Sequence, residues 1–276
     1  KSFKSYPGEL LQYEPQITLQ QRSKELRSYY TGEFSEEFQK RNGIKSDRIN
    51  EVFSRLSPEA IAFQHAFIAD NPNPLGSKHL MDKSAHVERR EYAEFHANYH
   101  PYFRNFLEKF GYYDIFLVEP ENGRVVYSVF KELDYATSLL DGPYSQSNFA
   151  AAFRAVQGSR NSDLVKMVDF DEYYPSYQSA ASFLSVPIID GDEPVGVLVF
   201  QIPIDQINTT MTNSGSWNSV GLGRSGETYM VSNDYSMRND SRLLIEDPDS
   251  YFGILQKQNT AAEKITRIRS LQSSIL

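Results

Sequence analysis

The sequence lacks cysteine altogether in its 276 residues. Disulfide bonds, thiolate nucleophiles and cysteine-based zinc or iron–sulfur sites are therefore excluded. Positive charge is also scarce, because 28 Lys and Arg residues stand against 36 Asp and Glu residues and leave a formal charge of −8. Lys and Arg never occur in runs longer than two, so the chain lacks the electrostatic footprint of a nucleic-acid groove or of a patch for anionic lipids.

Long hydrophobic runs are missing too. No stretch approaches the roughly 20 apolar residues that a membrane-spanning helix needs, and the uncharged segment 206–223 is rich in Asn, Thr, Ser and Gly. The chain begins without a start methionine or a signal-like apolar region. We therefore expect a piece of a longer protein, in which any contact with a membrane is made by segments outside this chain.

The first part of the chain has helical periodicity. From about residue 10 to residue 110 the apolar residues recur every three or four positions, which predicts several helices. Ser57 before a proline is typical of a helix N-cap, and the Asn-Pro-Asn-Pro run at 71–74 predicts a loop. A last helix is predicted over 87–110, with one aromatic face that we expect to cover a sheet: Tyr92, Phe95, Tyr99, Phe103, Phe106 and Phe110.

After Gly111 the apolar period changes to two, which predicts strands. An Asn-Gly turn at 122–123 between alternating runs is a strong hairpin signal. The order of two strands, a helix at 146–157 and three antiparallel strands behind long helices predicts an α+β fold with a PAS-like sheet module. The expected strands span 112–118, 124–130, 164–171, 181–189 and 195–202.

A set of longer motifs is more specific than this layout. The motifs are FGYYDIFLV at 110–118, GRVVYSVFKELD at 123–134, YYPS at 173–176, VPI at 186–188, GVLVFQ at 196–201, GLGRSGETYMV at 221–231 and MRNDSR at 237–242. Together they resemble the double Cache (dCache) sensor domains that lie outside bacterial membrane receptors. The resemblance covers roughly residues 60 to 245.

The resemblance implies a domain plan and a function. A helical region at 1–110 would precede a membrane-distal Cache module at 111–205, and 206–276 would hold a linker and a partial membrane-proximal module that opens with a strand near 221–231. The chain would be the periplasmic part of a bacterial inner-membrane protein that signals as a homodimer. It would bind a small solute and pass a conformational shift to a chemotaxis, histidine kinase or cyclase effector beyond its C-terminus.

Two features depart from the family pattern. Members that bind amino acids carry an Arg-x-Trp-Tyr signature in the first module, whereas the only Trp here is Trp217, so an amino-acid ligand is disfavoured. The second module also stops after about one strand and two helical segments, at 251–258 and 261–271. It is therefore expected to be truncated, and the tail from Ser232 onward to be less protected than the first sheet.

An enzymatic alternative rests on the predicted helix at 87–110. His96 and His100 lie four residues apart, with Glu91 and Glu94 nearby, so a soluble metal-dependent hydrolase is conceivable. Structural or hydrogen-bonding roles for these histidines are favoured, because the chain has no His-Glu-x-x-His motif. The Gly-x-Gly-x-x-Gly run at 221–226 stands before a predicted strand rather than after one, so we expect no nucleotide site and no cofactor.

The favoured site is a ligand pocket in the first sheet module. It is expected between the strand that ends at Lys131 and the strand with Asp169, under a roof formed by 134–144. An inward Asp169 needs a cation from the ligand, Lys131 or Arg154, whereas a one-residue change of register turns it to solvent. The candidate ligand-binding residues are Tyr127, Lys131, Asp134, Tyr135, Asp169, Tyr173, Tyr174, Ser182 and Gln201.

The partner of this domain is therefore expected to be a small polar or zwitterionic solute with an apolar body. The dimer surface is expected on the helix over residues 10–30, near Leu19 and Leu26, because its apolar stripe has no predicted sheet beneath it.

Overall fold

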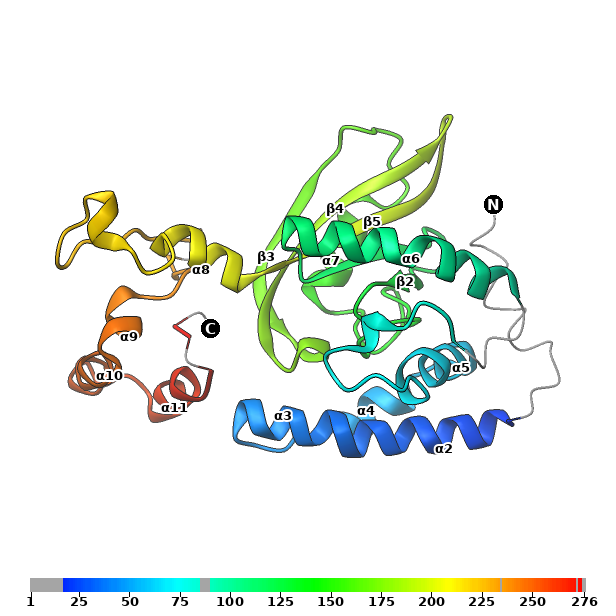
Figure 1. Ribbon diagram of the computed structural model, residues 1–276, viewed down its shortest axis with the longest axis horizontal. Helices are drawn as coiled ribbons and strands as arrows, with labels where there is room; N and C mark the ends of the chain where they lie inside the picture. Colours follow the sequence, from blue (N-terminus) through cyan, green and yellow to red (C-terminus); the bar gives the residue numbers. More distant parts are fainter. Residues whose placement is uncertain (1–16, 85–89, 234, 272, 275–276) are drawn as a thin grey trace.

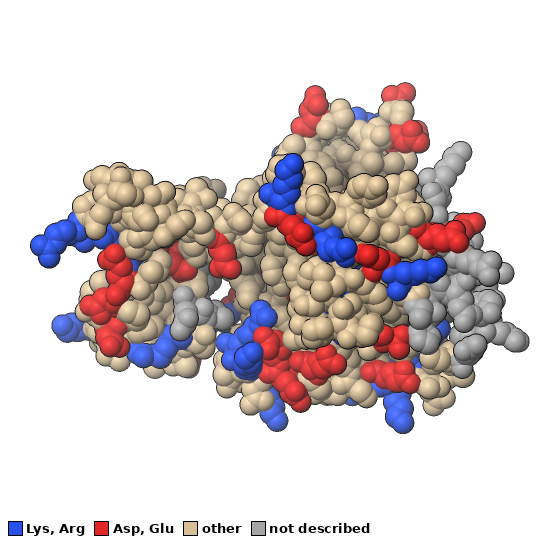
Figure 2. All heavy atoms as spheres, in the orientation of Figure 1, with Lys and Arg blue, Asp and Glu red and all other residues tan. Residues whose placement is uncertain are grey.

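The structure is a computed structural model that describes residues 17–84, 90–233, 235–271 and 273–274. An antiparallel sheet lies between helices, the N-terminal helices lie along one side, and a helical C-terminal segment is set apart from the sheet (Figure 1). The predicted α+β class is confirmed. Figure 2 shows Lys and Arg residues interspersed with Asp and Glu on the face in view, without a large patch of either sign.

The N-terminal helices form their own aromatic core. Thr18 caps the helix over Leu19–Tyr29 by accepting a hydrogen bond from the Gln21 amide. Gly43, with a backbone in the left-handed region, ends the helix over Ser35–Asn42. Leu26, Tyr30 and Phe34 are buried in this core. The stripe proposed as a dimer surface is thus covered by the chain itself, so that prediction is wrong for Leu26. The elements are α2 (Leu19–Tyr29), η2 (Tyr30–Phe34), α3 (Ser35–Asn42), α4 (Ile49–Ser54), α5 (Pro58–Gln64), η3 (His65–Ala69) and η4 (Lys78–Leu80).

Helix α6 (Arg90–Phe110) covers one face of the sheet with a different stripe from the one predicted. His96, His100 and Leu107 are buried, since residues four and seven apart share a helix face. Of the predicted aromatic stripe, Tyr99 and Phe110 remain 49% and 56% exposed. The prediction that the whole aromatic face covers the sheet is therefore wrong, because the two histidines take the central positions.

The sheet has the strand order β2-β1-β5-β4-β3, and all its pairs are antiparallel. Alternation along β1 sends Phe116 to a cluster beneath α7 and Ile115 to a cluster beneath α6. The predicted strands and the predicted helix are confirmed to within a few residues. Their bounds are β1 (Asp114–Val118), β2 (Val125–Ser128), α7 (Asn148–Val156), β3 (Lys166–Tyr173), η5 (Tyr174–Ser176), β4 (Ser179–Asp190) and β5 (Glu193–Pro203).

The C-terminal segment is helical. The strand predicted at 221–231 is wrong, since this stretch contributes only an isolated bridge between Val231 and Met237 and has no neighbouring strand to pair with in the described chain. Within the described residues, no helix has the length and apolar character needed to cross a membrane. The helices are α8 (Ile204–Thr212), η6 (Trp217–Val220), α9 (Arg242–Glu246), α10 (Pro248–Lys257) and α11 (Ala262–Leu271).

Candidate functional site

A cavity of about 220 Å³ lies between the N-terminal helices and the segment that follows β2. The cavity is smaller than a ligand pocket of about 300–1,000 Å³, so any ligand that fits it must be small. Its lining combines aromatic rings with four charged side chains, three positive and one negative. The lining residues are Tyr29, Phe34, Arg41, Leu75, Gly76, Lys78, Tyr113, Phe130, Lys131, Glu132, Leu133, Pro175 and Tyr177.

Two of the positive charges come from the helical region. The Arg41 guanidinium stacks 4.3 Å from the centre of the Tyr177 ring, and its Nε donates to Glu37 at 2.7 Å. Lys78 is 5% exposed, and its Nζ donates to the Asn71 carbonyl at 3.0 Å. Burial lowers the pKa of Lys78. Both cations are thus held in place by neighbours before any ligand arrives.

Lys131 supplies the third positive charge from beneath the cavity. Its backbone has a φ of 61°, in the left-handed region that residues with a Cβ seldom adopt. Its Nζ donates to the Ser128 carbonyl and lies 4.5 Å from the centre of the Tyr127 ring and 5.0 Å from that of Tyr135. Burial lowers the pKa of Lys131 to about 7, although the Asp114 carboxylate opposes this effect.

Asp114 is the buried anion near Lys131. Its carboxylate accepts hydrogen bonds from the amides of Ile115, Val129 and Phe130 and from the Ser128 hydroxyl. Burial raises its pKa to about 6 in spite of these hydrogen bonds. The contacts with residues 128–130 hold the end of β2 and thereby aim the next residue, Lys131, under the cavity.

Glu132 is the acidic member of the lining. It accepts a hydrogen bond from the Tyr113 hydroxyl at 2.6 Å and one from the Ser176 hydroxyl at 2.8 Å. The Gln201 amide donates to Ser176 at 3.1 Å, which links β5 to the site. Burial, together with the charge of Asp134, raises the pKa of Glu132 to about 8. This carboxyl group is therefore mostly protonated at neutral pH and is placed to form a hydrogen bond with a polar group of a ligand.

A buried polar layer lies behind Glu132. Tyr173 donates to Asp134 Oδ2 at 2.6 Å, while Asp134 Oδ1 accepts no hydrogen bond from the described residues. The Tyr144 hydroxyl and Gln201 Oε1 are also unpaired within the described part of the chain. Burial and the Asp114 charge raise the pKa of Asp134 to about 7. The site is therefore backed by acceptors whose hydrogen-bonding capacity is unused.

Of the predicted site residues, only Lys131 lines the cavity. Asp134, Tyr173 and Gln201 lie behind it in the hydrogen-bonded layer. The remaining four on the sheet and its flanks bond elsewhere: Tyr127 with His100 at 2.7 Å, Tyr135 with Tyr92 at 2.8 Å, Tyr174 with Ser46 at 2.6 Å and Ser182 with the Val168 carbonyl at 2.8 Å.

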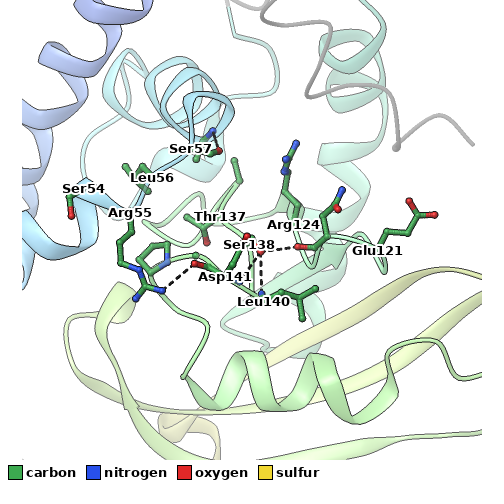
Figure 3. Close-up of a pocket in the computed structure, with 15 residues that line it drawn as sticks. Ser54, Arg55, Leu56, Ser57, Glu121, Arg124, Thr137, Ser138, Leu140 and Asp141 are labelled. Carbon is green, nitrogen blue, oxygen red and sulfur yellow. Dashed lines mark hydrogen bonds between the residues drawn. The ribbon is translucent and has the colours of Figure 1, made fainter.

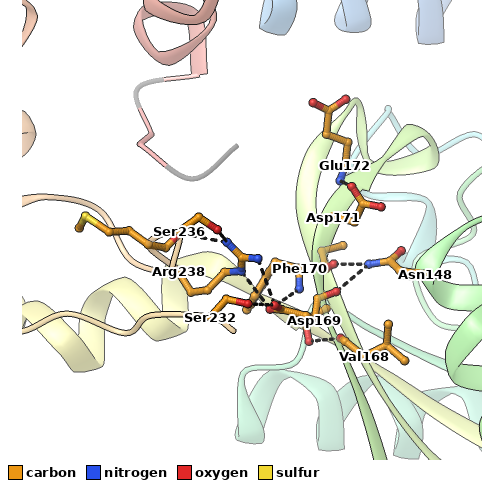
Figure 4. A network of polar contacts seen from close by, with 12 residues as sticks. Asn148, Val168, Asp169, Phe170, Asp171, Glu172, Ser232, Ser236 and Arg238 are labelled. Carbon is orange, nitrogen blue, oxygen red and sulfur yellow. Dashed lines mark hydrogen bonds and ion pairs between the residues drawn. The ribbon is translucent and has the colours of Figure 1, made fainter. Parts of the chain in front are cut away.

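Asp169 faces away from the cavity. Its side chain is 50% exposed and binds the Arg238 guanidinium, as Figure 4 shows. Neither Lys131 nor Arg154 is its cation, because Arg154 donates to the carbonyls of Leu139 and Ser145. The structure therefore contradicts an inward Asp169, whose side chain lies exposed beside a bulge between Val168 and Asp171 of β3.

The predicted roof at 134–144 does not enclose the cavity. Its outer side helps to line a separate cleft of about 440 Å³ beside the α4–α5 junction (Figure 3). There the Ser138 hydroxyl donates to the Asn122 carbonyl at 2.8 Å, and Arg55 donates to the Asp141 carbonyl at 3.1 Å. This cleft contains none of the predicted site residues.

The histidine pair on α6 has hydrogen-bonding partners. His96 Nδ1 lies 2.8 Å from the Asp82 carbonyl, and His100 Nε2 lies 2.7 Å from the His79 carbonyl. Burial lowers the pKa of His100 to about 3, whereas Glu91 and Glu94 are exposed on the helix. Among the described residues, no group of three or more acidic or histidine side chains is placed to hold a metal.

Sequence reasoning missed most of the lining. Arg41, Lys78 and Tyr29 belong to the helical region, and no sequence signal shows which face of a helix packs against the 131–133 segment. Glu132 and Tyr113 lie within the recognised motifs. Glu132 could have been found from the sequence, because it is a charged residue directly after Lys131 at the end of a largely apolar run.

No family model matches the chain, and no curated protein matches it. Two solved structures show a distant structural similarity to the chain. The sensor domain of the histidine kinase DctB from V. cholerae shares 16% identity at a TM-score of 0.31, over 66% of this chain and 60% of that one. The ligand-binding domain of the amino acid chemoreceptor PctC from Pseudomonas aeruginosa PAO1, in complex with GABA, shares 12% identity at a TM-score of 0.33, over 91% of this chain and 79% of that one.

One is the sensor domain of a histidine kinase and the other is the ligand-binding domain of a chemoreceptor. The predicted resemblance to such domains is confirmed at the level of this structural similarity. The chain spans 60% of the length of the DctB sensor domain.

Proposed function

We propose that this chain is the periplasmic ligand-binding domain of a bacterial inner-membrane receptor and that it binds a small solute without transforming it. The observation that carries the proposal is the cavity of about 220 Å³ that is lined by Arg41, Lys78, Lys131, Glu132 and aromatic rings. A few converging polar groups among aromatic side chains are typical of a small-molecule site.

The lining indicates the chemical class of the solute. Arg41 and Lys78 in the lining favour a carboxylate, because a guanidinium and an ammonium form charge-assisted hydrogen bonds with it. Glu132 favours an amine or hydroxyl donor. Tyr29, Phe34 and Tyr177 fit an apolar body. We therefore propose a small carboxylate with a donor group at its other end.

The signalling mechanism we propose has two states. The helical region 1–110 and the sheet module 111–205 would bind the solute between them, and 206–276 would form a linker with a partial second module. A solute that binds one arrangement of these parts better than another shifts the balance between them. A chemoreceptor, histidine kinase or cyclase effector outside the chain would receive that shift.

Binding is expected to depend on Arg41 and not on Arg55, which lies in the separate cleft of Figure 3. The assay is thermal shift followed by titration calorimetry with amino acids, small mono- and dicarboxylates, and amines at millimolar concentration. Arg41→Met should weaken binding of the best carboxylate at least about tenfold, the loss expected for one charge-assisted hydrogen bond. Arg55→Met is the matched control and should bind like the parent. If no compound in the panel binds, or if Arg55→Met alone abolishes binding, the proposal fails.

A further inference from the structure

The MRNDSR segment at 237–242 joins several parts of the chain. Asn239 Oδ1 accepts a hydrogen bond from the Met230 amide at 2.6 Å, and Asp240 contacts Ser273 at 2.8 Å. Arg242 donates to the carbonyl of Gly226 at 2.8 Å. These contacts stay within the C-terminal segment. Arg238 instead reaches across to the edge strand of the sheet.

The contact between Arg238 and Asp169 has two-point geometry. Arg238 Nε and Nη2 each lie 3.0 Å from one carboxylate oxygen of Asp169, and the Ser232 hydroxyl donates to the same carboxylate at 2.7 Å (Figure 4). The Arg238 side chain is 9% exposed. Partial burial raises the pKa of Asp169, but the hydrogen bonds from Arg238 and Ser232 outweigh it and the pKa lies below its usual value. Such two-point pairs fix orientation as well as distance.

A bulge in β3 presents Asp169 to the C-terminal segment. The register of β3 against β4 shifts between Val168 and Asp171, and a bulge of this kind redirects side chains. The Asn148 amide holds the bulge by donating to the Asp169 carbonyl at 3.2 Å and to the Ala181 carbonyl at 2.6 Å. Asn148 is the first residue of α7, which directly follows the segment that contains Lys131, Glu132 and Asp134.

We propose that the Asp169–Arg238 pair is a latch that docks the C-terminal segment on the sheet edge, and that Asn148 couples this latch to the 131–147 segment. In the docked state the pair is closed. When the N-terminus of α7 moves, the bulge relaxes, Asp169 turns away from Arg238, and residues 230–242 lose their contact with the sheet edge. The ion pair between Arg267 of α11 and Glu172 of β3 is a separate contact. The latch requires no ligand, so its test is independent of the proposed binding function.

Hydrogen exchange of the full chain, read by mass spectrometry, tests the latch. Asp169→Asn keeps the shape of the side chain and removes its charge, so amides in 230–242 should exchange about tenfold faster. Asp171→Asn is the matched control, since Asp171 lies two residues away on β3 and its carboxylate bonds only the Glu172 amide among the described residues. It should leave exchange in 230–242 unchanged. Equal effects of the two variants, or no effect of Asp169→Asn, would overturn the latch.

Asn148→Ala tests the coupling. It should accelerate exchange in 230–242 even though Asn148 has no contact with Arg238 among those the structure records. Unchanged exchange there would overturn the coupling. If Asn148→Ala also loses protection in β4 and β5, the sheet itself is disturbed and a second variant is needed. The double variant Asp169→Arg with Arg238→Asp exchanges the two charges. Restored protection in 230–242 supports a charge-paired latch, and no restoration contradicts it.

Discussion

Replacing Asp114 by alanine is expected to lower the free energy of unfolding by about 3–5 kcal/mol, the cost typical of removing one partner from a buried charged network. The substitution leaves the amides of Ile115 and Phe130 without this acceptor, leaves the Val129 amide with the Ile115 carbonyl as its acceptor, and leaves Lys131 buried without this nearby anion. Unfolding in urea, followed by circular dichroism, measures the change.

Asp114→Asn is the matched control for that substitution. Its side-chain oxygen can still accept from the three amides, so its loss of stability should be much smaller than that of the alanine variant. Equal losses would show that the charge near Lys131, and not the three amide hydrogen bonds, dominates. A loss below about 1 kcal/mol for Asp114→Ala would contradict the role given to this carboxylate in holding the end of β2.

Glu132→Gln is expected to stabilise the unliganded domain at the alkaline end of its pH range. The pKa of Glu132 is raised from 4.5 to about 8 in the folded protein. The stability linked to its protonated form is therefore complete below its unfolded pKa and is lost as the pH rises through about 8. The variant should gain little near pH 5 and about 2 kcal/mol or more near pH 8, at about 1.4 kcal/mol per unit of pKa shift.

The neighbouring groups set the pH window for this test. Raised pKa values of about 7 for Asp134 and about 6 for Asp114 act in the same direction as Glu132. Lys131 acts in the opposite direction. Its pKa is lowered from 10.5 to about 7 in the folded protein, so the stability linked to its neutral form is complete above pH 10.5 and is lost as the pH falls through about 7. Buried His100 also acts oppositely, because its pKa is lowered from 6.5 to about 3 and its contribution is lost as the pH falls below 6.5. Parent stability should thus fall as the pH rises from about 6.5 to about 7.

Glu94→Gln, at an exposed position, is the control and should have the stability of the parent at every pH. A gain in stability for Glu132→Gln that does not grow with pH would contradict the raised pKa of Glu132.

Much of the sheet could be predicted because its signals are local. The Asn-Gly turn and the alternation from Val125 to Ser128 report a strand pair directly, and Ser57 caps its helix as expected. The buried charges Lys131 and Asp134 were also recognised, since charged residues next to apolar strands need partners.

The rest depends on contacts that sequence patterns do not encode. Arg41 and Lys78 reach the cavity because of the way the helical region rotates against the 131–133 segment, which is decided by packing between distant residues. Asp169 lies exposed beside a bulge that shifts the register of β3, and a shift of one residue exchanges the two faces of a strand. The aromatic stripe of α6 is not the face that packs on the sheet, because His96 and His100 are buried in the positions that apolar residues usually take.

The most direct test of the proposed site is a crystal structure of the domain with the carboxylate that binds best in the panel. We expect the ligand in the 220 Å³ cavity, with its carboxylate within hydrogen-bonding distance of Arg41 and Lys78 and its donor group at Glu132. A ligand found in the cleft of Figure 3, between Arg55 and Arg124, would contradict the assignment.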